Sequence, residues 1–242
     1  MLLALFLIGS AAGLYLFLPL VGRRNAGVKF YRMILLIGGA LAALALIAHF
    51  MAGRRDLPWV DGVVVALTAL VLLVLRYPKR LIFRFASLLL GVAYLVAAVF
   101  AFHAAVRPSN VGWSIAGALA SLALLGSVNL AMILGHWYLV VRGMSIDPLK
   151  RLTVATLATA IVKVLLVIAV IVLNPQPMND IFFWMRAGWG LLGPLALYPM
   201  VWGTVKLRST MAATGILYVD VVAVIIGEVL GGILAAQHHL PL

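Results

Sequence analysis

Hydrophobic residues run along this chain in long blocks that short polar segments separate. Eight of these blocks reach or approach the roughly 20 residues that an α-helix needs to cross the hydrocarbon core of a bilayer. The predicted spans cover residues 2–21, 33–52, 58–76, 85–106, 112–141, 152–173, 181–205 and 210–236. The pattern therefore predicts an all-α, polytopic membrane protein with eight transmembrane helices.

The composition agrees with this prediction. Of the 242 residues, 66% are hydrophobic and 10% are charged, and the mean hydropathy is +1.20. A soluble domain of this length has too little interior to bury so much apolar surface. Residues 2–21 have no basic segment before them and are followed by Arg23 and Arg24, so we expect a retained first span rather than a cleaved signal peptide.

Basic residues gather in alternate connections between the spans. Those after the first, third, fifth and seventh spans contain Arg23, Arg24, Lys29, Arg32, Arg76, Lys79, Arg80, Arg84, Arg142, Lys150, Arg151, Lys206 and Arg208. The other connections contain Arg54, Arg55 and Arg107. Because lysine and arginine favour cytoplasmic loops, we predict a bacterial-type inner (cytoplasmic) membrane protein with both termini outside. The same distribution accounts for the net charge of +12 without a nucleic-acid partner.

The two halves of the chain share a sequence pattern. Arg-x6-Gly-x2-Tyr opens the fourth and eighth spans, and a Gly-Ser pair recurs in the first and fifth spans. The residues are Arg84, Gly91 and Tyr94 with Arg208, Gly215 and Tyr218, and Gly9-Ser10 with Gly126-Ser127. Four spans per half would give both halves the same orientation, as in parallel transporter repeats. We therefore predict two four-helix bundles, residues 1–110 and 111–242, in one membrane domain. The alternative is chance, because these residue types are common in membrane helices.

Four charged residues lie within the predicted spans of the second half: Lys163, Arg186, Asp220 and Glu228. Each costs roughly 2.5–3.5 kcal/mol on insertion scales, and such residues commonly mark functional sites. The predicted depths allow Lys163 to pair with Asp220 near mid-depth and Arg186 with Glu228 toward the outer side. The four are candidates for a quinone, substrate or proton path. The alternative is that their ion pairs only hold helices together.

Glycines and prolines make the seventh span irregular. Between residues 188 and 199, a proline at 194 is expected to kink the helix, since it removes a backbone donor and crowds the preceding turn. Backbone groups freed in this way need protein or a polar cavity around them, so this span is predicted to face the interior. Two glycine pairs also have the spacing of close helix contacts. They are Gly9 and Gly13, and Gly227 and Gly231.

Histidines suggest a different cofactor. His49 and His103 end the second and fourth spans at a similar depth, which is one requirement for a bis-histidine b-type haem. Contact with water and lipid headgroups is the alternative. With no cysteine, the chain excludes disulfides and thiolate-held clusters. It contains no P-loop and no HExxH sequence, so we predict no metal site and no catalytic residues, and leave enzymatic activity open.

Eight spans, outer termini and a parallel duplication resemble the topology of the NrfD-like family, the membrane anchor subunits of polysulfide, nitrite and dimethyl sulfoxide reductase complexes. The resemblance covers the whole chain, but no family motif falls on particular residues. It implies a haem-free subunit that binds a quinone between helices and serves a neighbouring redox protein. The four intramembrane charges would then be candidates for hydrogen bonding to the quinone or for proton transfer.

The sequence thus predicts an integral membrane subunit of an electron-transfer complex, either quinone-interacting or a structural anchor. Its expected partners are other membrane or redox subunits and the lipid bilayer. One alternative is a small-solute transporter with a site at Lys163, Asp220 and the kinked seventh span. Others are a b-type haem cytochrome with His49 and His103 as ligands, a purely structural subunit, and a membrane enzyme acting on lipids.

Overall fold

The computed structural model describes residues 1–53, 58–74, 80–141 and 143–242. Within these ranges the chain is helical and contains no strand, which confirms the all-α prediction. The helices are α1 (Leu2–Val21), α2 (Arg23–Met51), α3 (Pro58–Val74), α4 (Arg80–Val106), α5 (Val111–Val140), α6 (Asp147–Leu173), α7 (Ile181–Met185), α8 (Gly193–Lys206) and α9 (Thr210–His238). A short 3₁₀ turn, η1 (Gln176–Asn179), precedes α7, and a π-helix, η2 (Arg186–Leu192), joins α7 to α8.

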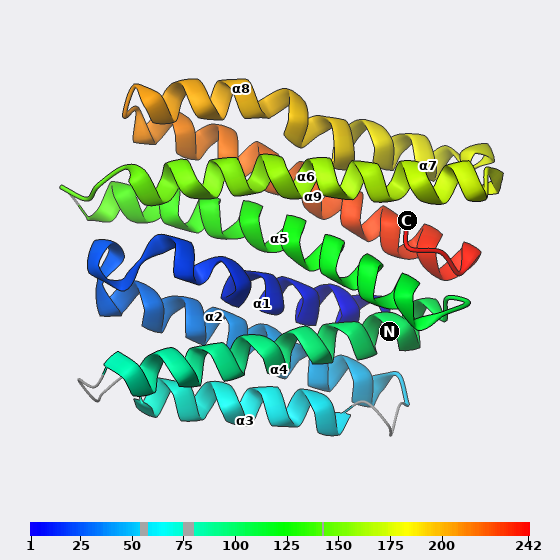
Figure 1. The fold of residues 1–242 in the computed structure, drawn as a ribbon, viewed down its shortest axis with the longest axis horizontal. Coiled ribbons are helices and arrows are strands. Elements are labelled where there is room, and N and C mark those ends of the chain that lie inside the picture. The colour runs from blue at the N-terminus through cyan, green and yellow to red at the C-terminus, as the bar shows by residue number, and fades with distance from the viewer. Residues whose placement is uncertain (54–57, 75–79, 142) are drawn as a thin grey trace.

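The long helices all run along the longest axis of the molecule (Figure 1). Helices α1 and α5 lie in the middle, with α3 and α4 along one edge and α7 and α8 along the other. Both chain termini lie toward one end, which we call the terminal end. The α1–α2, α5–α6 and α8–α9 connections lie at the opposite end (Figure 1). Of the basic residues used to predict orientation, Arg54, Arg55, Arg76, Lys79 and Arg142 lie outside the described residues.

Among the residues that the structure describes, six helices are long and apolar enough to cross a membrane. They are α1, Asn25–Met51 of α2, Leu89–Val106 of α4, α5, α6 and α9. Helix α3 is shorter, with an apolar stretch at Trp59–Leu73. The seventh predicted span is divided among α7, η2 and α8. The described part of the chain thus has the helices of a multi-pass membrane protein.

Two helices begin well before the apolar blocks that predicted them. Helix α2 starts at Arg23 and bends at Gly27, whose φ of 77° is left-handed. Helix α6 starts at Asp147, with Pro148 in its first turn, where a missing backbone donor has no cost. In both cases polar residues extend the helix beyond the stretch that hydrocarbon would cover. Apolar block length therefore underestimates these helices.

The side chains are arranged with apolar groups outside and charged groups inside. On α6, Leu165 and Val172 are exposed, whereas Lys163 on the opposite face is fully buried. Arg186 is also fully buried, at the junction of α7 and η2. This inverted pattern is expected when the solvent around the protein is hydrocarbon.

Helix contacts follow the same order in the two halves. Helix α1 packs against α2 and α4, and helix α5 packs against α6 and α9. The halves meet where α1 crosses α5 at Gly13 and Gly126. A Cβ atom on Gly13 would lie 2.1 Å from the main-chain oxygen of Leu122, so no larger residue fits this crossing. By contrast, α1 and α9 make few contacts, which leaves space between them.

The predicted irregularity of the seventh span is confirmed, and it takes the form of a π-helix. Residues Arg186–Leu192 form the wider turns directly before Gly193 and Pro194. Proline cannot donate to the preceding turn, and a π-helix relieves the crowding there by adding one residue to the loop of each hydrogen bond. As a result, Arg186 and Gly190 both face α9.

Candidate functional site

A buried cluster joins three of the four predicted charged residues. The Glu228 carboxylate on α9 lies 3.6 Å from Lys163 Nζ on α6 and 3.5 Å from Arg186 Nη2 on η2. Lys163 and Arg186 are fully buried, and Glu228 is 8% exposed. One carboxylate is therefore the shared countercharge of two cations in the interior of the helix bundle.

Of the two pairs that the predicted depths allow, Arg186 with Glu228 is present, whereas Lys163 contacts Glu228 instead of Asp220. Counted from the first residues of their helices, Lys163 lies about four turns into α6, Glu228 about five turns into α9 and Asp220 about three. Lys163 is thus nearly level with Glu228. The apolar block of the sixth span starts at residue 152, later than α6 itself, so depth measured along this block places Lys163 too close to the level of Asp220.

Hydrogen bonds to neighbouring helices complete the cluster. Lys163 Nζ donates to Ser121 Oγ of α5 at 2.8 Å and to the main-chain oxygen of Leu242 at 3.4 Å. Arg186 Nη1 donates to the main-chain oxygen of Gly227 at 3.0 Å. Within the described part of the chain, Nε and Nη2 of Arg186 have no hydrogen-bond partner. The guanidinium is thus held by one hydrogen bond and the charge of Glu228.

Glycines on α9 make room for this arrangement. A Cβ atom on Gly231 would lie 1.2 Å from Arg186 Nη1, so the guanidinium occupies the place of a side chain there. A Cβ atom on Gly227 would lie 2.2 Å from the Cα atom of Gly190, so the backbones of α9 and η2 touch. The spacing of Gly227 and Gly231 predicted close helix contact, and the structure confirms it.

An apolar cavity of about 380 Å³ lies beside the cluster, between α1, α4, α5 and α9. Ser121 and Glu228 are the two polar side chains among the described residues that line it. Leu242 also lines the cavity and contacts Lys163 through its main-chain oxygen. The cavity therefore combines hydrocarbon walls with a hydroxyl and a carboxyl group.

The cavity reaches the outer surface between α1 and α9. Its lining residues Leu3 and Val229 are exposed to 61% and 45% respectively. A Cβ atom on Gly9, another lining residue, would meet no atom within 4 Å. A ligand dissolved in the bilayer could enter sideways, with an apolar chain at the surface and a polar head at Ser121 and Glu228.

Asp220 lies apart from the cluster. It is 2% exposed, and its Oδ1 atom has no hydrogen-bond partner in the described part of the chain. The transporter alternative required Asp220 to meet Lys163, which contacts Glu228 instead. Asp220 therefore stays a separate candidate for a proton path.

The two histidines proposed as haem ligands contact different helices. His49 Nδ1 lies 2.5 Å from Asp61 Oδ2 on α3, and His103 Nδ1 lies 2.7 Å from Ser114 Oγ on α5. Sequence reasoning missed Asp61, a buried carboxyl group at the start of α3. The sequence did offer a signal: His49 and Asp61 lie close to the two ends of one short connection, which brings them near each other. No group of three His, Cys, Asp or Glu residues in the described ranges could hold a metal ion.

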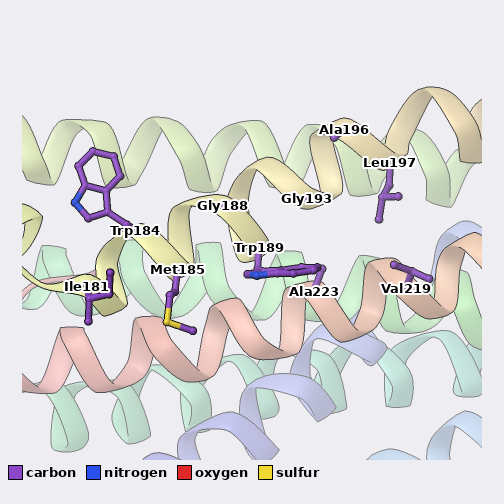
Figure 2. Close-up of a pocket in the computed structure, with 10 residues that line it drawn as sticks. All are labelled: Ile181, Trp184, Met185, Gly188, Trp189, Gly193, Ala196, Leu197, Val219 and Ala223. Atoms are coloured by element: carbon purple, nitrogen blue, oxygen red, sulfur yellow. The ribbon is translucent and has the colours of Figure 1, made fainter.

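A second hollow has a different character. It measures about 650 Å³ and lies between the α7–η2–α8 segment and α9 (Figure 2). Every side chain that lines it is apolar, and Gly188 and Gly193 line the remainder. The ring of Trp189 lies beside Ala223, whereas Trp184 turns away from α9 (Figure 2). This groove offers surface for an apolar chain but no group for proton or electron chemistry.

No known family model, curated protein or solved structure matches this chain. The function is therefore inferred from the geometry of the ion cluster and its cavity.

Proposed function

We propose that this chain is the quinone-binding integral membrane subunit of an electron-transfer complex. The observation that carries the proposal is the cavity that opens between α1 and α9 and ends at Ser121 and Glu228. A quinone combines an isoprenoid tail, which dissolves in the bilayer, with a head that needs hydrogen-bonding groups. The cavity offers apolar walls for the tail near its opening and the Ser121 hydroxyl and Glu228 carboxyl for the head at its other end.

The chemistry of quinol oxidation gives these side chains a role. A quinol that becomes a quinone loses two electrons and two protons, and the electrons pass to a redox centre on a partner subunit. Loss of an electron makes the quinol hydroxyl strongly acidic, so a carboxylate near it can accept the proton even when cations hold it. In this proposal Glu228 takes that proton, and the Ser121 hydroxyl positions the head of the quinol.

Lys163 and Arg186 act on the ligand through Glu228. Both contact its carboxylate from opposite helices, and Lys163 also donates to Ser121. Together they hold the two polar groups of the cavity wall in fixed positions. A buried carboxylate without such partners would carry a large desolvation cost.

The proposal includes the membrane topology. Eight helical segments cross a bacterial-type inner membrane, both termini lie outside, and the halves form two four-helix bundles in parallel duplication. The matching order of helix contacts in the two halves and the location of both termini at one end support this topology. The resemblance to NrfD-like anchor subunits supports the association with a redox partner.

Native purification in mild detergent, followed by mass spectrometry, tests the proposal. We expect quinone and redox subunits to copurify with the chain. Gly9→Leu should lower the bound quinone about tenfold or more, because the new side chain occupies the cavity. Gly215→Leu is the matched control: Gly215 is exposed on α9 and also has no atom within 4 Å of an added Cβ.

The control should retain the quinone content of the unaltered chain. A chain that purifies alone, or a quinone content that Gly9→Leu leaves unchanged, would contradict the proposal.

A further inference from the structure

The last residues of the chain turn back into the helix bundle. Helix α9 ends at His238, and His239 has a left-handed φ of 58° that reverses the chain direction. His239 Nδ1 lies 2.7 Å from the main-chain oxygen of Val106, at the end of α4. Leu242 N donates to the Leu240 oxygen at 2.9 Å. Residues 239–242 therefore form a compact turn that points inward from the terminal end (Figure 1).

This turn fits among four helices. Pro241 and Leu242 are buried, and Leu242 is 2% exposed. A Cβ atom on Gly117 of α5 would lie 2.8 Å from Pro241 Cβ, so the glycine leaves the space that the proline occupies. Leu242 packs in one apolar cluster with Phe102 of α4. The segment thus fills a gap that the helices leave between them.

The turn also reaches the proposed quinone site. Leu242 lines the inner end of the cavity, and its main-chain oxygen accepts from Lys163. Lys163 therefore connects three parts: Glu228, the Ser121 hydroxyl, and residues 239–242. At one end of the turn His239 contacts Val106, the residue before the exposed Arg107 of the α4–α5 connection, and at the other end Leu242 lines the cavity.

We infer that residues 239–242 are a plug, held by Lys163 and Val106, that separates the inner end of the quinone cavity from water at the terminal end. Release of the plug admits the water that carries protons away from Glu228. Quinol oxidation delivers two protons into a site whose carboxylate is 8% exposed, so such a route is required. This inference rests on the proposed function for its role and on the packing of residues 239–242 for its existence.

Because the chain contains no native cysteine, a thiol reagent labels only a cysteine that is introduced at a chosen position. Single cysteines are placed by Leu242→Cys and, as an exposed reference on the same chain end, by Gln237→Cys. Both proteins in lipid nanodiscs are reacted with a water-soluble maleimide. We expect the cysteine at 242 to react at least about tenfold more slowly than the one at 237, because reaction there requires local opening. Equal rates at the two positions would overturn the plug.

Removal of the Lys163 contact should free the plug. Added to the reporter chain, Lys163→Met should raise the labelling rate at 242 about tenfold and leave that at 237 unchanged. Lys206→Met is the matched control. Lys206 lies over the Trp202 ring on α8, so this substitution also removes a lysine, but at a place away from the plug. An unchanged rate with Lys163→Met would contradict the role of Lys163.

A second variant covers the case in which Lys163→Met fails to fold. Gly117→Ala places a methyl group against Pro241 and Phe102 without changing the ion cluster, and it should also accelerate labelling at 242. Absence of acceleration in a folded Gly117→Ala protein would overturn the plug. The quinone content of the same samples is measured separately. Protected labelling at 242 without bound quinone would refute the proposed function and leave the plug in place.

Discussion

The two halves of this molecule share an order of helix contacts but bury different polar groups. In the first half, the described buried polar side chains are hydroxyl groups and the pair His49–Asp61. In the second half they include the cluster of Lys163, Arg186 and Glu228. The comparison shows that a common helix arrangement supports either a hydrogen-bonded interior or a charged one.

Tyr94 and Tyr218, which the proposed repeat pairs, have different surroundings in the two halves. Tyr94 is fully buried, and its hydroxyl lies 2.9 Å from Thr68 Oγ1 and donates to the Gly38 oxygen at 3.3 Å. Tyr218, its counterpart in the proposed repeat, is 46% exposed on α9. The corresponding interior of the second half instead contains η2 and the glycines of α9, which admit the guanidinium of Arg186. Proton transfer at the proposed site is therefore expected to depend on the ion cluster of the second half, whereas α1 and α4 of the first half supply apolar cavity wall.

The largest expected effect comes from removing the shared carboxylate. Glu228→Gln leaves Lys163 and Arg186 as buried cations without a countercharge, which should destabilise the protein by about 3–5 kcal/mol. Quinol turnover of the parent complex should fall about 100-fold or more, because a proton acceptor is lost. Unfolding is followed by tryptophan fluorescence in detergent, and turnover by quinol absorbance.

Asp61→Asn is the matched change in the first half, where the carboxylate partner of His49 is lost. It should lower stability while turnover per folded complex stays unchanged. A Glu228→Gln complex that turns over at the normal rate would remove Glu228 from the mechanism. Equal losses of turnover in the Glu228→Gln and Asp61→Asn variants would contradict the proposal that the carboxylate of the second half takes part in turnover and that of the first half does not.

A smaller effect is expected from the glycine that admits Arg186. Gly231→Ala places a methyl group where Arg186 Nη1 now lies, so the guanidinium must move and its contact with Glu228 weakens. We expect destabilisation of about 1–3 kcal/mol, as for other overpacked interiors. The neighbouring Gly232→Ala is the control, because its added Cβ would meet Leu2 at an ordinary distance of 3.6 Å. Equal thermal stability of the two variants would show that Arg186 does not need this gap.

Parts of this architecture were predictable because a membrane restricts the choices. Each apolar block must satisfy its own backbone hydrogen bonds, so blocks of this length predict helices, and the described helices match them. The pairing of Arg186 with Glu228 followed from their similar depth. The partner of Lys163 did not, because polar residues extend α6 back to Asp147 and shift its register against α9.

The cavity and the plug had no signal of their own in the sequence. The cavity exists because Gly9 has no side chain and because α1 and α9 make few contacts, and the second of these is a property of packing alone. The plug depends on a left-handed residue, His239, and on the gap at Gly117. Such features arise from contacts between distant segments, which hydrophobic periodicity does not encode.

The smallest effect is expected in the hydrogen-bonded interior of the first half. Tyr94→Phe removes the hydroxyl that bonds to Thr68 and Gly38, whereas Thr68 keeps its own hydrogen bond to the Val64 oxygen at 2.7 Å. Side-chain hydrogen bonds inside membrane proteins contribute on average about 0.6 kcal/mol, so we expect a loss of that size. Tyr218→Phe, at the position that the proposed repeat pairs with Tyr94, should change stability by less because that side chain is half exposed.

Thermal unfolding of the two variants, side by side in the same detergent, measures this difference. Turnover should be normal in both, since neither tyrosine touches the cavity or the ion cluster. A Tyr94→Phe protein as stable as the Tyr218→Phe protein would show that the buried hydroxyl network contributes nothing to the first half. A loss of turnover with Tyr94→Phe would instead extend the functional region beyond the cavity and the ion cluster, into the hydroxyl network of the first half.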